Sequence, residues 1–190
     1  MSTASSKASL RAELRRARRA LPPALAAAES ACSVATVQAW LAERPSPPAL
    51  ASYLALSGEL DLDALHQAWL ASGRPVWLPS VRGDNLDWHP VSSLDQVRPG
   101  AFGVREPDPG QVPVARIPAE AVVLVPGVGY GGDGRRLGQG GGFYDRFLAR
   151  HRGPAIGVGF ACQRADDLPL DPHDHPVAGV VLGGTWILKP

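Results

Sequence analysis

The residues best suited to chemistry lie between Ala121 and Arg150, in the segment AVVLVPGVGYGGDGRRLGQGGGFYDRFLAR. An apolar run leads into nine glycines interspersed with Arg135 and Arg136, and a helical pattern follows. Glycine lets the backbone come close to a ligand, and free N–H groups beside guanidinium groups and a helix start attract anions. The segment therefore predicts a phosphate-binding site.

Of two common phosphate-binding motifs, one is absent from this chain and the other matches the segment only in part. The Walker pattern G-x-x-x-x-G-K-[ST] does not occur in the chain. Gly127, Gly129 and Gly132 match G-x-G-x-x-G, but a dinucleotide-binding fold needs a helix to open at the third glycine. Five more glycines follow before residue 143, a density that no helix tolerates. We expect a glycine loop that ends in a helix over residues 143–151.

The composition is that of one globular domain. The chain has 190 residues, of which 45% are hydrophobic, and its formal net charge is +1. Cys32 and Cys162 form no metal or redox motif, which favours a reduced, cytoplasmic setting. The sequence contains neither an apolar run of transmembrane length nor the core of a signal peptide, so we expect no membrane partner.

Positive charge is concentrated at the N-terminus, where residues 1–19 hold six cationic side chains against Glu13 alone. Such an arm could bind nucleic acid, form a solvated helix face, or extend to the phosphate loop. Nucleic acid is disfavoured because no aromatic residues are interleaved and the pI is about 7.9.

The positioning elements alternate between helices and strands. Helices are expected over residues 9–21, 25–43 and 62–72, the last with Asp61 as N-cap and Gly73 as C-cap. Strands are expected over residues 49–54, 121–125, 155–160 and 179–182, and over 76–78, where Pro79 should end the strand. This alternation predicts an α/β sheet with helices on its faces, and ligands of such sheets bind at the carboxyl ends of strands. Tyr53, Pro79, Pro126 and Phe160 lie at or near such ends, so we expect the segments that follow them to converge.

Several motifs occur in a fixed order along the chain. The most specific is Gly134-x-Arg136-Leu137-Gly138-x-Gly140-Gly141-Gly142-x-Tyr144-Asp145-Arg146. The others are Lys7-x-x-Leu10-Arg11, Tyr53 with Glu59 and Asp61, Phe102-Gly103-Val104-Arg105-Glu106-Pro107, Gly157-x-x-Phe160-x-x-Gln163, and His173-Asp174. In this order they resemble the 5-formyltetrahydrofolate cyclo-ligase (methenyltetrahydrofolate synthetase) family, from Lys7 to about Val181.

The resemblance implies an enzyme that uses ATP and Mg²⁺ to convert 5-formyltetrahydrofolate to 5,10-methenyltetrahydrofolate, ADP and phosphate. It also implies a single domain over residues 1–190 with the open, largely parallel sheet of the sugar-phosphate isomerase/CoA transferase-like fold. Helices would lie on both faces, and residues 1–21 would form a basic helix contributing to the nucleotide site. Small molecules would be its only partners, and a monomer is expected.

The resemblance also assigns roles to individual residues. Arg136 and Glu59 would be catalytic, and Glu59 and Tyr53 would bind the folate. Asp145, together with Asp133, would belong to the metal site, in keeping with the few carboxylates that Mg²⁺ needs beside phosphate oxygens. The nucleotide would be held by Lys7, Arg11, Arg136, Gly138, Gln139, Gly140, Gly141, Gly142, Phe143 and Tyr144.

Some positions depart from the family pattern. Tyr130-Gly131 stands where the family usually has Phe-Asp, which removes a carboxylate associated with the metal; Asp133 could replace it. Gln139 occupies the place of an aromatic residue, and Leu62 that of a Thr. Near the end, Ala178 and Leu182 stand for an Asp and a Thr.

These departures leave a second hypothesis open, a catalytically divergent paralogue that binds nucleotide or folate for a regulatory purpose or in other cofactor metabolism. A third, a nucleic-acid-binding module using the basic arm, would predict salt-dependent binding to any duplex.

Overall fold

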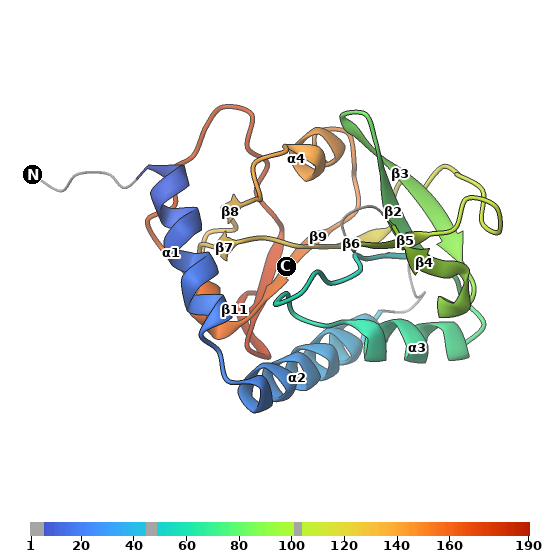
Figure 1. Cartoon of the computed structure of the whole chain (residues 1–190), viewed down its shortest axis with the longest axis horizontal. Coiled ribbons are helices and arrows are strands. Elements are labelled where there is room, and N and C mark those ends of the chain that lie inside the picture. The colour runs from blue at the N-terminus through green and yellow to red at the C-terminus, as the bar shows by residue number, and fades with distance from the viewer. Residues whose placement is uncertain (1–5, 45–48, 101–103) are drawn as a thin grey trace, which may run out of the picture.

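An open sheet of seven strands forms the centre of the computed structural model, which describes residues 6–44, 49–100 and 104–190 (Figure 1). The strand order is β11-β10-β9-β6-β1-β2-β3. The strands from β10 to β2 run parallel, and antiparallel β11 and β3 form the two edges. The bounds are β1 Leu50–Ala51, β2 Val76–Arg82, β3 Asn85–Val91, β6 Val122–Val125, β9 Ala155–Gly159, β10 Gly179–Leu182 and β11 Thr185–Leu188. The prediction of a largely parallel open α/β sheet is confirmed.

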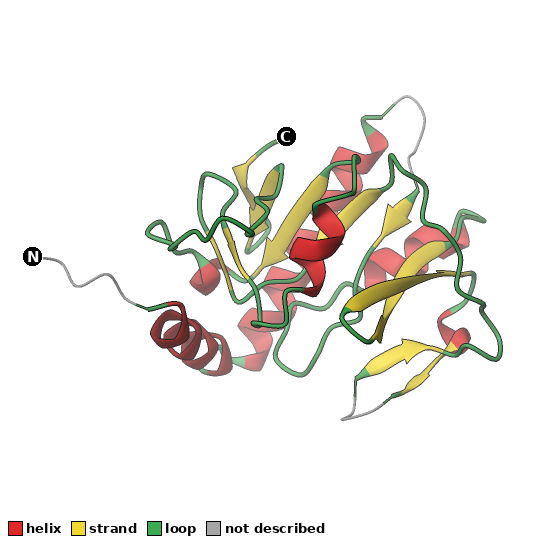
Figure 2. Ribbon diagram, turned by 90° about the horizontal axis from the view of Figure 1, so that it is seen from above, coloured by secondary structure: helices red, strands yellow, loops and turns green. Residues whose placement is uncertain are grey.

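Helices cover both faces of this sheet (Figure 1 and Figure 2). Strand β6 is buried at every position, as expected of a strand covered on both sides. Helices α2 (Pro23–Ala42) and α3 (Asp63–Ala71) pack on one face through Trp40 and Leu65, against Val122 and its neighbours. Helix α4 (Phe143–Leu148) packs on the other face, where the Phe147 and Trp88 ring centroids are 4.9 Å apart.

Helix α1 (Lys7–Arg19) packs beside the sheet rather than on one of its two faces (Figure 1). It begins where the Ser6 hydroxyl accepts a hydrogen bond from the Ser9 N–H, 3.2 Å away. Its apolar residues Leu10 and Leu14 pack against Val128, Leu137 and Leu168. These partners lie in and around the hairpin formed by β7 (Gly129–Tyr130) and β8 (Arg136–Leu137).

The long region between β3 and β6 carries only short elements. They are η1 (Leu94–Gln96), β4 (Val97–Pro99) and β5 (Arg105–Pro107), the two strands being antiparallel. The start of the Phe102–Pro107 motif, up to residue 103, lies outside the described residues. No single helix among the described residues is long and apolar enough to cross a bilayer; α1 and α2 pass such a test only when joined, and they meet at a bend of 103°.

Three expectations about local structure were wrong. Strand β2 does not end at Pro79 but continues to Arg82, paired with β3. Strand β1 pairs only with Val76 and Trp77, so Pro79 lies where one side of β2 has no neighbouring strand and a missing N–H is tolerated. Asp61 does not cap α3 as its N-cap residue, which is Leu62; its carboxylate accepts from the Asp63 N–H instead, 2.9 Å away.

The third concerns the glycine-rich segment, which is not a continuous loop. Its first half forms the β7–β8 hairpin, and only residues 138–142 connect that hairpin to α4. Helix α4 begins at Phe143 as expected but ends at Leu148. Strand β11 was not anticipated, because its four residues follow β10 after only a two-residue turn.

Candidate active site

The predicted site segments meet at the carboxyl ends of the central strands. The loop after β1 carries Glu59, the segment after β6 begins with Pro126, and Phe160 follows β9. Glu59 and Phe160 line the same groove. Pro79 does not join them because β2 continues past it into the hairpin with β3.

Arg136 is the buried cation of the site, with a side chain only 3% exposed. Its guanidinium donates to Asp145 Oδ1 at 2.7 Å and to the Pro126 carbonyl at 3.3 Å, while its Nε has no acceptor among the described residues. Gly138 makes room for it, because a Cβ there would lie 2.8 Å from Arg136 Nη1. The guanidinium also lies 5.9 Å from the centroid of the Tyr144 ring. A cation is thus held under the glycine segment with part of its donor capacity unused.

Helix α1 presents a row of cations to this segment. Lys7, Arg11, Arg15 and Arg18 are spaced by three or four residues, so they share one helix face. Arg11 Nε donates to the Gly138 carbonyl at 2.9 Å, and Arg15 Nη2 donates to Gln139 Oε1 at 2.5 Å. The apolar stripe of Leu10 and Leu14 borders this face, so the packing of α1 on the hairpin also directs the cations toward the glycine segment.

Lys7 forms ion pairs with Asp171, at 2.6 Å, and with Asp174. Asp171, His173 and Asp174 place their ligand atoms within 4.8 Å of one another, and within the described ranges they form the one group of three such residues. Lys7 thus offsets one of the two carboxylate charges of this group, although it was predicted to bind nucleotide.

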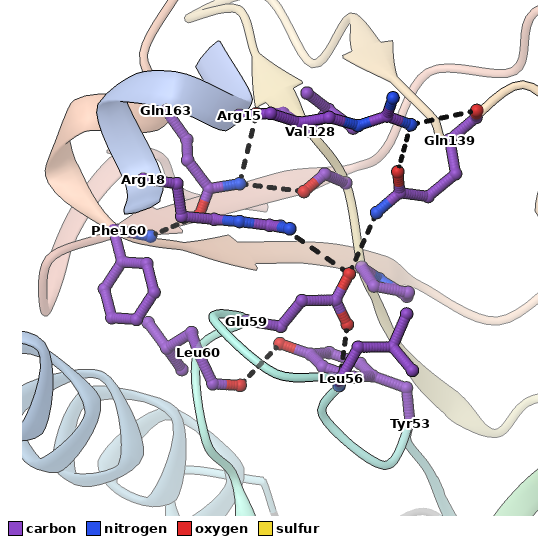
Figure 3. A network of polar contacts seen from close by, with 12 residues as sticks. Arg15, Arg18, Tyr53, Leu56, Glu59, Leu60, Val128, Gln139, Phe160 and Gln163 are labelled. Atoms are coloured by element: carbon purple, nitrogen blue, oxygen red, sulfur yellow. Dashed lines mark hydrogen bonds and ion pairs between the residues drawn. The ribbon is translucent and has the colours of Figure 1, made fainter. Parts of the chain in front are cut away.

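Glu59 lies at the junction between the glycine segment and the groove (Figure 3). Its Oε2 accepts from the Leu56 N–H at 3.2 Å, and its Oε1 accepts from Gln139 Nε2 at 3.0 Å. Arg18 Nη1 is 3.6 Å from the same Oε1. Arg15, Gln139, Glu59 and Arg18 therefore form a continuous polar chain from the glycine segment to the groove.

Tyr53 holds the Glu59 loop in place through a hydrogen bond to its backbone. Its hydroxyl donates to the Leu60 carbonyl at 3.2 Å, and the residue is buried. Burial raises the pKa of the Tyr53 phenol well above its usual range, so it serves as a neutral donor. It does not line the groove, and a direct contact with substrate stays a prediction.

A second network fixes the start of α3, close to the same loop. His66 Nε2 lies 2.7 Å from the Ser52 hydroxyl, and Arg105 contacts both carboxylate oxygens of Asp63, at 2.6 and 2.9 Å. The His66 ring and the Arg105 guanidinium hold the pKa of the Asp63 carboxyl well below its usual range.

The two predicted metal ligands lie in different surroundings. Asp133 pairs with Arg135 Nε at 2.6 Å, and that guanidinium extends toward residues 166–168. Asp145 pairs with Arg136, and both hydrogen bonds that it accepts from described residues go to Oδ1. Asp145 thus keeps a carboxylate oxygen that fits Mg²⁺ beside phosphate oxygens, whereas Asp133 is held by its own arginine.

The groove beside Glu59 has a volume of about 890 Å³. It lies between the α1–α2 turn and the loop of residues 57–61, and much of its lining is apolar. Among its lining residues are Arg18, Arg19, Leu21, Ala27, Glu59 and Phe160. A volume of this size lies within the range of binding sites for small organic molecules.

Comparison with known proteins identifies the family of the chain. Residues 3–183 match the model of the 5-formyltetrahydrofolate cyclo-ligase family. The chain belongs to this family.

Relatives with that name come from several kingdoms. The cyclo-ligase of Mycolicibacterium smegmatis is 34% identical over 186 residues, covering 93% of each chain. That of Saccharomyces cerevisiae is 30% identical and covers 92% of this chain and 93% of its own.

Two solved structures share the fold. The 5,10-methenyltetrahydrofolate synthetase of Aquifex aeolicus superposes with a TM-score of 0.80 at 31% identity, covering 95% of this chain and 91% of its own. The synthetase of Mycoplasma pneumoniae gives a TM-score of 0.72 at 22% identity, covering 95% of this chain and all of its own, and supports the fold alone.

Sequence reasoning missed Arg15 and Arg18 as members of the site. The signal was present, since both continue the helical spacing that begins with Lys7 and Arg11. The contact between Gln139 and Glu59 carried no such signal, because 80 residues separate the two.

Proposed function

We propose that this chain performs the reaction of its family between α1, the glycine segment 138–142 and the Glu59 loop. The reaction is the ATP-driven conversion of 5-formyltetrahydrofolate to 5,10-methenyltetrahydrofolate. The observation that carries this location is the polar chain from Arg15 through Gln139 to Glu59, since it joins a phosphate-type segment to an organic-ligand groove. Both substrates of the reaction must meet at such a junction.

The nucleotide would bind on the glycine side of this junction. Lys7, Arg11 and Arg136 would contact its phosphate oxygens, with the backbone of residues 138–142, Phe143 and Tyr144 around them. Each of these cations now contacts a carbonyl or carboxylate, which phosphate oxygens would replace. Asp145, through Oδ2, would hold Mg²⁺, which supplies charge neutralisation at the phosphates when bound.

The folate would bind on the groove side with Glu59 at its pterin end. The formyl oxygen attacks the γ-phosphorus and ADP leaves, which turns a poor leaving group into phosphate. N10 then attacks the formyl carbon, phosphate departs with the formyl oxygen, and N10 loses its proton. Arg136 would stabilise charge on the transferred phosphoryl group, and Glu59 would orient the ring, so catalysis is mainly positioning and charge neutralisation.

The same proposal includes a cytoplasmic monomer that binds neither nucleic acid nor membrane. Cys32 and Cys162 are free thiols, which supports a reducing compartment. The α1 cations contact the glycine segment, the Glu59 loop and the Asp171–Asp174 turn, which leaves fewer of them for a nucleic-acid backbone.

The test mixes purified protein with 5-formyltetrahydrofolate and MgATP and follows the absorbance of methenyltetrahydrofolate, with reactions lacking ATP and with Arg136→Ala as controls. ATP-dependent product that Arg136→Ala loses would support both the activity and its location. A folded protein that binds ATP but forms no product would instead favour the divergent paralogue, and the lost carboxylate positions Gly131 and Ala178 would be the first to examine.

A further inference from the structure

Arg18 and Glu59 form an opposite-charge pair at one end of the groove (Figure 3). Their side chains are 10% and 7% exposed, so both charged groups are nearly removed from solvent. The separation of 3.6 Å between Arg18 Nη1 and Glu59 Oε1 is too long for a hydrogen bond. The pair is therefore attracted electrostatically while its hydrogen-bonding capacity is largely unused.

The unused capacity lies on both partners. Arg18 carries five N–H donors, and its Nε is buried without an acceptor among the described residues. A carboxylate offers about four acceptor sites, and Glu59 uses two of them, for Gln139 and for Leu56. Buried donors and acceptors left unpaired are costly, so this end of the groove favours a ligand that satisfies both.

A ligand edge that satisfies both must carry N–H donors for the carboxylate and a carbonyl acceptor for the guanidinium, side by side in one plane. The pterin end of a folate has this pattern, because its 2-amino group and N3–H are donors and its 4-oxo group is an acceptor. An amino group in place of the 4-oxo oxygen would turn a donor toward the donors of Arg18, and N3, which then carries no hydrogen, would turn an acceptor toward Glu59.

We propose that Arg18 is a specificity-determining residue that donates to the 4-oxo oxygen of the pterin while Glu59 accepts from the neighbouring N–H groups. This inference rests on the proposed function and adds a residue to its folate site. Arg18 comes from α1 and Glu59 from the loop after β1. In this proposal Arg18 contacts the 4-oxo side of the ring edge and Glu59 contacts its N–H side. Neighbouring Arg19 is exposed at the groove margin and is less suited to this role.

The experiment measures dissociation constants in the absence of ATP. The ligands are 5-formyltetrahydrofolate, tetrahydrofolate (the 4-oxo ligand) and the 2,4-diamino analogue of tetrahydrofolate (the diamino ligand). The variants are Arg18→Met, which keeps side-chain length without the charge, and Arg18→Lys, which keeps the charge without the planar fork. Arg16→Met is the matched control: it removes one charge from the same helix, at an exposed position that does not line the groove. Thermal unfolding of each variant shows that it is folded.

Wild-type protein should bind the 4-oxo ligand at least about tenfold more tightly than the diamino ligand, because a donor facing a donor leaves both unpaired. Arg18→Met should weaken the 4-oxo ligand about ten- to a hundredfold and the diamino ligand much less, so that discrimination falls to the part that Glu59 supplies through N3. Arg18→Lys should restore part of it, and Arg16→Met should change neither constant. In turnover, Arg18→Met should raise KM for the folate and leave KM for ATP unchanged.

Equal weakening of both ligands by Arg18→Met would overturn the inference, since it would mean that Arg18 only balances the charge of Glu59. Unchanged affinity for both would overturn it as well. In either case wild-type turnover would still support the proposed function. Wild-type protein that binds no folate would refute the function and the inference together.

Discussion

The buried pair of Arg136 and Asp145 allows a quantitative test of how the site is held together. Replacing Arg136 with Met keeps the side-chain length but removes two hydrogen bonds, one of them to a carboxylate at 2.7 Å. The bond to the carboxylate contributes about 2 kcal/mol and the longer bond to the carbonyl about 1 kcal/mol, so the free energy of unfolding should fall by about 3 kcal/mol. Because Asp145 keeps a side-chain exposure of 16%, water limits the cost of leaving it unpaired.

For a chain of this length, that loss should lower the thermal midpoint by roughly 6–12 °C. Urea unfolding of Arg136→Met, Asp145→Asn and the double variant would isolate the interaction, with an expected coupling energy of about 1.5 kcal/mol or more. In turnover, Arg136→Met should lower kcat/KM for ATP by about a hundredfold, as expected when a donor to developing phosphate charge is lost.

Arg135→Met is the matched control. The neighbouring arginine pairs with Asp133 and with carbonyls of residues 166 and 168, so its loss removes the same charge outside the proposed phosphate site. It should leave KM for ATP unchanged. A coupling energy under about 0.5 kcal/mol, or equal effects of both substitutions on KM for ATP, would refute the assignment.

Three further predictions concern packing, pH and the link between the two substrate sites. Gly157→Ala would place a methyl group 2.4 Å from Cε1 of Tyr130, and urea unfolding should show a loss of about 1–3 kcal/mol. Asp63 has a depressed folded pKa, so its stabilisation is fully present above the unfolded pKa of about 3.9 and is lost as the pH falls below it. The stability difference between wild type and Asp63→Asn, from urea unfolding, should thus be constant at pH 5–7 and shrink below about pH 4. Gln139→Leu removes the hydrogen bond to Glu59 and should raise KM for the folate by about two- to tenfold in steady-state assays.

Each of these has a control within the chain. Gly110→Ala adds a methyl group that meets nothing closer than 3.4 Å, so it should change stability by less than about 0.5 kcal/mol. Asp95→Asn removes an exposed carboxylate, and its difference from wild type should not show the acid dependence predicted for Asp63. Gln139→Glu would place two carboxylates together and should weaken folate binding more than Gln139→Leu; an equal or smaller effect would contradict the predicted contact.

Much of the architecture could be predicted from local patterns. The buried strand Val122–Val125 and the helix start at Phe143 follow from an apolar run and from the end of a glycine series. The order of the motifs predicted the family. The β7–β8 hairpin could not be predicted, because the glycines at 129, 131, 132 and 134 suggested a loop, whereas they lie in or between its two strands.

The partners of the site residues were the least predictable feature. Lys7 was expected to be available for phosphate but contacts Asp171, 164 residues away, and no local pattern reports such a pair. The sequence placed both Asp133 and Asp145 in the metal site. It did not show that Asp133 pairs with Arg135 and Asp145 with Arg136. Residue types indicate which side chains are candidates for the chemistry, and that assignment stays a prediction, whereas the tertiary structure shows what each of them contacts without a ligand.

The docking of α1 against late segments also affects how the protein is made. Helix α1 is synthesised before the residues that it contacts, since its apolar side packs on residues near 128, 137 and 168 and Lys7 pairs with residue 171. At the usual pace of synthesis the helix waits on the order of ten seconds for these partners. During that interval Leu10 and Leu14 lack their packing partners on a strongly basic helix, so the nascent chain is open to chaperone capture until the segment around residue 171 has been made.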